Sequence, residues 1–107
     1  MPSHPEYPAP DGLSERSQAL WAAVVPAQAI SAGRRALVEE ALRSLDRADQ
    51  MREAVDRDGA VTTNATTGMV HVHPCCKIER EARQAFSRLW TTMHLEWSTH
   101  EDGRIRG

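Results

Sequence analysis

Apolar residues recur every three or four positions along two long stretches of this chain, which is the spacing of one face of an α-helix. The first stretch runs from about Ala32 to Asp58. It follows Ser31, whose side chain can cap a helix start, and it precedes Gly59, which suits the turn past a helix end. This stretch predicts a helix of about 27 residues and about 40 Å. Its apolar stripe consists of Leu37, Val38, Ala41, Leu42, Leu45, Ala48, Met51 and Val55.

A second amphipathic helix of about 20 residues is predicted to begin at Pro74, because proline loses no hydrogen bond at the first helical position. Between Gly59 and Pro74 the period shortens to two residues, and β-branched residues flank the turn-prone segment 64–67. This change predicts a small β-hairpin or an ordered loop between the two helices. The apolar positions of the second helix are Ile78, Ala82, Ala85, Phe86, Leu89, Trp90, Met93 and Trp97.

A shorter helix is predicted after Ser14, which is a good N-cap, and we expect it to end where Pro26 cannot continue it. The elements together predict an all-α fold, with this short helix followed by a long antiparallel helical hairpin. So thin a core leaves apolar surface on its outer sides, and we therefore expect self-association. The apolar face of the short helix consists of Leu20, Trp21 and Val24.

The ends of the chain lack this apolar periodicity. Residues 1–12 hold four of the six prolines, so we expect a flexible arm there. Residues 98–107 are polar and predict a flexible tail, which leaves residues 13–97 as one helical domain.

Composition narrows the functional classes. The 107 residues carry a formal net charge of −2, so the chain is not a bulk polycation that binds any nucleic acid. No apolar run approaches the roughly 20 residues of a membrane helix, and no leader pattern follows Met1. We expect a cytoplasmic protein without a membrane partner, in which Cys75 and Cys76 stay reduced.

Enzymatic motifs for nucleotide binding, metalloprotease or serine-hydrolase chemistry do not occur in the sequence. We therefore expect no catalytic residue, no cofactor and no enzyme activity. The acidic residues of the first long helix have arginines three or four positions away, which is typical of a solvated helix surface. They are Glu39, Glu40, Asp46 and Asp49, with Arg43 and Arg47.

The residue types that ligate metals gather in one place, where His71 and His73 precede Cys75 and Cys76. Their spacing is not that of a zinc finger, and no second Cys or His pair follows. We interpret them as solvent-facing strand histidines and two small, buried cysteines, and we expect no metal.

Arg34 and Arg35 lie in the first turn of the long helix, where free backbone amides favour negative charge. A bound phosphate would use both the amides and the guanidinium groups. The alternative is that both side chains extend into solvent or pair with Glu39. Further possible phosphate contacts are Arg16, Arg104 and Arg106.

Candidates for contacts between subunits are apolar positions on the two long helices. Core packing is the default for Trp90, whereas Trp97 lies among polar residues at a helix end. The full set is Leu37, Leu45, Trp90 and Trp97.

The order of these segments resembles the small terminase subunits of tailed double-stranded-DNA phages. The likeness covers roughly Leu13 to Trp97. It lies in the Leu-Trp of the first helix, in Glu-Glu-Ala followed by Asp-Arg-Ala-Asp in the second, and in the segment that ends in His-Pro. The resemblance implies a non-catalytic subunit that forms a homo-oligomeric ring in the host-cell cytoplasm. It also implies that the ring recognises viral DNA for packaging and regulates the large terminase subunit, which holds the ATPase and nuclease.

One departure from the family pattern concerns DNA recognition. Only one short helix fits before Ser31, so the helix-turn-helix that many small terminases carry is not expected here. Phosphate contacts by Arg34 and Arg35, or recognition of DNA shape, then become the expected modes. Two other hypotheses remain open, namely a helical-hairpin adaptor that oligomerises without nucleic acid, and a small metal-binding module.

Overall fold

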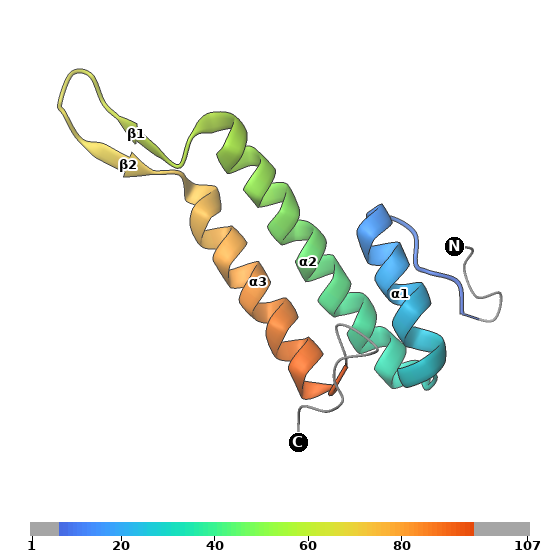
Figure 1. Ribbon diagram of the computed structural model, residues 1–107. Helices are drawn as coiled ribbons and strands as arrows, with labels where there is room; N and C mark the ends of the chain where they lie inside the picture. The colour runs from blue at the N-terminus through green and yellow to red at the C-terminus, as the bar shows by residue number, and fades with distance from the viewer. Residues whose placement is uncertain (1–6, 96–107) are drawn as a thin grey trace, which may run out of the picture.

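The computed structural model describes residues 7–95, which form three helices and a two-stranded sheet (Figure 1). Helix α1 spans Glu15–Gln28 and helix α2 spans Ala32–Asp58. Strands β1 (Val61–Thr63) and β2 (Val70–Val72) pair antiparallel, and helix α3 spans Pro74–Thr92. The expectation of a helical protein with a small β-hairpin between two long helices is confirmed.

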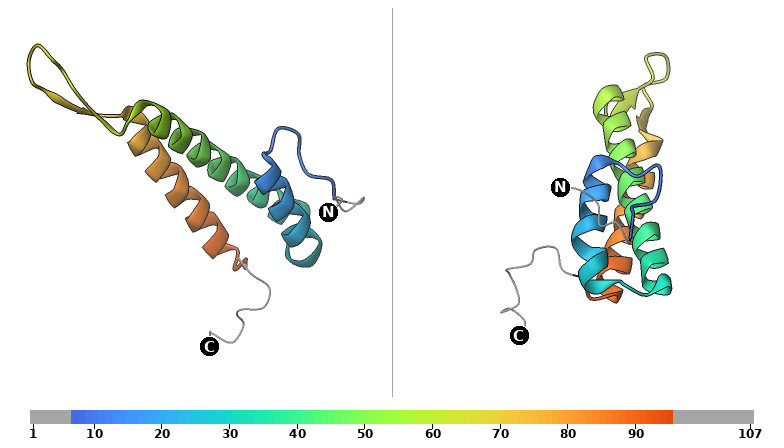
Figure 2. Two further views of the ribbon diagram at one scale, coloured as in Figure 1. Left: turned by 45° about the horizontal axis from the view of Figure 1, so that its top comes forward. Right: turned by 90° about the vertical axis from the view of Figure 1, so that its right-hand side faces the viewer.

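Helices α2 and α3 run antiparallel along their length, and α1 covers only the part of α2 farthest from the β-hairpin (Figures 1 and 2). The cap predicted from Ser14 is present, because its hydroxyl accepts a hydrogen bond from the Ser17 amide. Ser31 caps α2 in the same way through the Arg34 amide. No helix within residues 7–95 is both long enough and apolar enough to cross a membrane.

The prediction that the first helix ends before Pro26 is wrong, because α1 continues through Pro26 to Gln28. Proline lacks an amide hydrogen, so at this position the helix loses one hydrogen bond, to the carbonyl of Ala22. The turn is retained because Val25 is fully buried and its carbonyl still accepts the Ala29 amide at 3.1 Å. One lost bond near a helix end is outweighed by packing.

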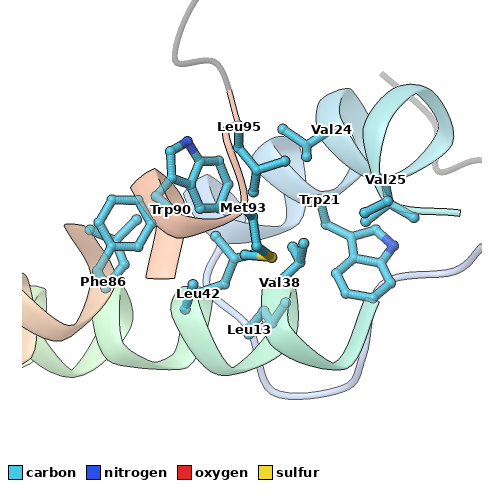
Figure 3. Packing of buried hydrophobic residues seen from close by; sticks show 13 residues of the cluster. Leu13, Trp21, Val24, Val25, Val38, Leu42, Phe86, Trp90, Met93 and Leu95 are labelled. Carbon is cyan, nitrogen blue, oxygen red and sulfur yellow. The ribbon is translucent and has the colours of Figure 1, made fainter. Parts of the chain in front are cut away.

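The hydrophobic core lies where α1, the first half of α2 and the end of α3 meet (Figure 3). Met93 and Leu95, which follow α3, pack over α2 beside valines of α1. Two of the predicted interface positions belong to this core, since Leu45 is 2% exposed and Trp90 is 1% exposed. Leu37 is 40% exposed on α2, and Trp97 lies outside the described residues.

Part of the segment expected to be an arm packs against α1. Tyr7 and Ala9 lie against the hydrophobic core, and the Trp21 indole donates a hydrogen bond to the Tyr7 carbonyl at 2.8 Å. Residues 1–6 and the tail 98–107 lie outside the described residues.

The prediction that all acidic residues of α2 are solvated is wrong for Asp46, because this residue is buried against the start of α1. Its carboxylate accepts hydrogen bonds from the Ser14 amide at 2.8 Å, the Ser14 hydroxyl at 2.6 Å and the Ser17 hydroxyl at 2.5 Å. Burial raises the pKa of this carboxyl, but the hydrogen bonds from Ser14 and Ser17 outweigh that effect and hold the pKa below its ordinary value. Asp46 thus fastens α1 to α2.

Candidate nucleic-acid interface

The guanidinium of Arg34 lies among the ends of three helices and is half-buried. Its Nε donates to the Gln28 carbonyl at 2.9 Å, and its Nη2 donates to the Met93 carbonyl at 2.7 Å. These carbonyls end α1 and α3, where a cation is electrostatically favourable. Arg34 therefore caps two helices, which is neither of the roles expected from the sequence.

Arg35 and Arg16 also make contacts within the chain. Arg35 donates to the Ile30 carbonyl, and its guanidinium lies 5.2 Å from the centre of the Tyr7 ring. Arg16 pairs with Asp49 at 3.3 Å. Arg104 and Arg106 lie outside the described residues. The structure therefore does not gather the three described arginines into one basic surface.

A different basic surface lies on the side of α3 that faces away from α2, and we call it the α3 outer face. Arg80, Gln84 and Arg88 recur at four-residue spacing, which places them along one side of the helix. All three are exposed, and together with Ser87 and Arg83 they line a shallow surface hollow. Arg80 and Arg88 are separated by about 12 Å along the helix axis. The other exposed members of this face are Lys77, Ser87 and Thr91.

The charge of this face differs in sign from the net charge of the chain. Within residues 7–95, Arg80 and Arg88 form no ion pair or hydrogen bond. Glu81 is the acidic residue on this side of α3, and its Oε2 lies 3.9 Å from Lys77 Nζ, so it offsets the charge of Lys77. Glu79 lies on the inner side with its side chain 14% exposed, where it pairs with Arg52 and Arg83. The α3 outer face is therefore net positive on a chain whose formal charge is −2.

This surface was not predicted from the sequence, although the four-residue spacing of Arg80, Gln84 and Arg88 is visible there. Spacing alone does not distinguish these arginines from those that pair within the fold. Which arginines are already paired depends on contacts with other helices, and Arg83 illustrates this through its 3.3 Å contact with Asp49 on α2.

The cluster considered for metal binding is dispersed by the fold. His73 lies at the base of the hairpin, where its Nε2 is 3.0 Å from Asp58 Oδ2 and its Nδ1 accepts the Cys75 amide at 3.0 Å. The hydrogen bond from His73, helped by Arg57, lowers the pKa of Asp58. His71 is exposed on β2, and no group of three or more potential ligands comes together in the region from Tyr7 to Leu95.

No protein-family model, no curated protein and no solved structure matches this chain.

Proposed function

We propose that this chain is a non-catalytic small terminase subunit, which engages double-stranded viral DNA for genome packaging and regulates the large terminase subunit. The resemblance from Leu13 to Trp97 supports the family assignment. The observation that supports DNA binding is the α3 outer face, where Arg80 and Arg88 point into solvent without a partner in the described part of the chain.

The chemistry of this face suits phosphate groups. Guanidinium groups donate several hydrogen bonds to phosphate oxygens, and Gln84 and Ser87 add neutral donors between them. One strand of duplex DNA carries a phosphate about every 3.4 Å along the helix axis. The roughly 12 Å between Arg80 and Arg88 thus spans about three phosphates of one strand.

Self-association gives this small surface its affinity. One copy with a formal charge of −2 and two exposed, unpaired arginines on α3 binds a polyanion weakly. In a symmetric ring the same face is repeated in every subunit, so the positive charge is multiplied along the DNA. No recognition helix is needed, because contacts to the backbone and DNA shape supply the interaction.

The test measures the affinity of a fluorescent duplex as a function of salt, for the wild type and for the double variant Arg80→Gln/Arg88→Gln. The control Arg43→Gln/Arg47→Gln removes the same formal charge from exposed positions on α2, where Arg43 pairs with Glu39 at 2.7 Å and donates to the Asp11 carbonyl at 3.1 Å. The α3 variant should flatten the plot of log affinity against log salt by about 0.9 for every phosphate that the protein no longer neutralises. The control should keep most of the wild-type slope.

An equal loss in both double variants would show that net charge, and not the α3 outer face, controls binding. No duplex binding by the assembled wild-type protein would favour the alternative function, a helical-hairpin adaptor that oligomerises without nucleic acid. The exposed and uncharged β-hairpin is the observation that favours this alternative.

A further inference from the structure

Arg83 lies at the edge of the α3 outer face, on the side of α3 that turns toward α2. It lines the same shallow hollow as Arg80 and Arg88, and its side chain is 40% exposed. Unlike those two arginines, Arg83 is paired within the fold. Its Nη2 donates to Asp49 Oδ1 on α2 at 3.3 Å, and its Nε donates to Glu79 Oε2 on α3 at 3.1 Å. A third guanidinium thus lies beside the proposed phosphate site, where two carboxylates hold it.

Each of these carboxylates also has an arginine at its other oxygen. Asp49 Oδ2 lies 3.3 Å from Arg16 Nη1 on α1. Glu79 Oε1 lies 3.5 Å from Arg52 Nη1 on α2. When Arg83 moves away, neither carboxylate is therefore left without a positive neighbour. This matters most for Glu79, because its side chain is only 14% exposed and a partly buried charge without a partner is costly.

The two contacts of Arg83 are also weak individually. At 3.1 and 3.3 Å they are longer than the roughly 2.7–2.9 Å of a strong charge-assisted hydrogen bond. A partly exposed ion pair of this kind changes an equilibrium by no more than about fivefold, and salt screens it further. A phosphate group of DNA offers the guanidinium fork two charged oxygens. A duplex on the α3 outer face can therefore compete with the carboxylates for Arg83.

We propose that Arg83 is a third phosphate ligand of the α3 outer face, and that Asp49 and Glu79 compete with duplex DNA for its guanidinium. On binding, Arg83 exchanges its carboxylate contacts for contacts with the DNA backbone. Its position suits this role, because it lies between Arg80 and Arg88 and about 4.5 Å from Arg80 along the helix axis. The inference rests on the proposed function, since it requires duplex DNA at this face.

The test is a double-mutant cycle on the affinity of a fluorescent duplex for the assembled protein, with Asp49→Asn, Arg83→Gln and their combination. Asp49→Asn removes one competitor for Arg83. The gain in affinity from this substitution should be about two- to fivefold larger when Arg83 is present than in the Arg83→Gln background. The cycle cancels the general effect of charge and that of Arg16, which loses its Asp49 partner in both backgrounds.

Glu81→Gln is the matched control, because Glu81 is an acidic residue of the outer side of α3 and pairs with Lys77. It also removes one negative charge near the DNA, and its effect on affinity should be the same with and without Arg83. Circular dichroism and thermal melting check that every variant is folded before the titration.

The salt dependence of binding provides a second readout at position 83. Arg83→Gln should lower the slope of log affinity against log salt by about 0.9, because one phosphate is no longer neutralised. Arg83→Lys should keep the wild-type slope, since an ammonium group also neutralises a phosphate. A residue that only links α3 to α2 would not show this rescue of the slope by lysine.

An equal gain from Asp49→Asn in both backgrounds would overturn the inference, because Asp49 would then act through its charge alone. A wild-type salt slope in Arg83→Gln would also overturn it. Either result leaves the proposed function intact when Arg80→Gln/Arg88→Gln flattens the slope. If the wild type does not bind the duplex, or if that double variant binds with an unchanged slope, the proposed function fails and this inference fails with it.

Discussion

Replacing Asp46 with asparagine should lower the free energy of unfolding by about 2–3 kcal/mol, because it weakens the link between α1 and α2. The carboxylate accepts three hydrogen bonds, from the Ser14 amide, the Ser14 hydroxyl and the Ser17 hydroxyl. A hydrogen bond to a charged group contributes about 1.5–3 kcal/mol. Asparagine keeps one acceptor oxygen, but its amide nitrogen then faces groups that donate.

A double-mutant cycle separates this network from the other effects of each substitution. Ser17 is fully buried, and Ser17→Ala removes one of the three bonds, so we expect a loss of about 1.5–2 kcal/mol. The double variant Asp46→Asn/Ser17→Ala should lose about 1–2 kcal/mol less than the sum of the two single losses. Glu40→Gln is the matched control, because Glu40 is an exposed acid on the same helix, and its effect should stay within about 0.5 kcal/mol.

The pH dependence follows from the lowered pKa of Asp46. A carboxyl whose pKa is lower in the folded state stabilises the fold above the unfolded pKa of about 3.9. That stabilisation is lost as the pH falls through the folded-state pKa. The difference in the free energy of unfolding between wild type and Asp46→Asn should therefore be largest near neutral pH and shrink below about pH 4.

Urea unfolding measures these quantities, with all variants at one chain concentration because assembly also contributes to apparent stability. The reasoning would be refuted if Asp46→Asn unfolded within about 0.5 kcal/mol of wild type at neutral pH. A cycle with no coupling between Asp46 and Ser17 would contradict the hydrogen-bond network itself.

Two further substitutions test other contacts. Arg34→Gln should lower the free energy of unfolding by about 1–3 kcal/mol, because it removes the guanidinium donors to the Gln28 and Met93 carbonyls. A loss below about 0.5 kcal/mol in urea unfolding would show that water replaces these donors. The hydrogen bond from His73 lowers the pKa of Asp58, so NMR titration should place its midpoint below about 3.9, and His73→Ala should raise it. The contribution of the Asp58–His73 pair to stability is fully present above the unfolded-state pKa of about 3.9, and it is lost as the pH falls through the lower folded-state pKa of Asp58. An Asp58 midpoint that His73→Ala leaves unchanged would exclude this pairing.

The elements whose causes are local were predictable from the sequence. Ser31, Gly59 and Pro74 bound the long helices by capping, a turn and a fixed backbone angle, each of which involves only nearby residues. Pro26 was misjudged for a physical reason, since the burial of Val25 retains a turn that local propensity alone would end.

Contacts between distant parts of the chain were not predictable in this way. Asp46 has the same neighbours in sequence as a solvated acid, and its burial comes from Ser14, which is 32 residues away. Arg34 reaches the Met93 carbonyl across 59 residues of sequence. The α3 outer face was predictable in part. The four-residue spacing of its arginines is visible in the sequence, whereas the absence of partners for Arg80 and Arg88 depends on the whole fold.

The central claim is that copies of this chain assemble before they act on DNA, and the mass of the wild-type protein in solution tests it most directly. Sedimentation equilibrium at physiological salt should find a closed assembly of several 11.9 kDa chains, with a mass that stays constant once it has formed. A folded single chain of 11.9 kDa at every concentration would contradict the account.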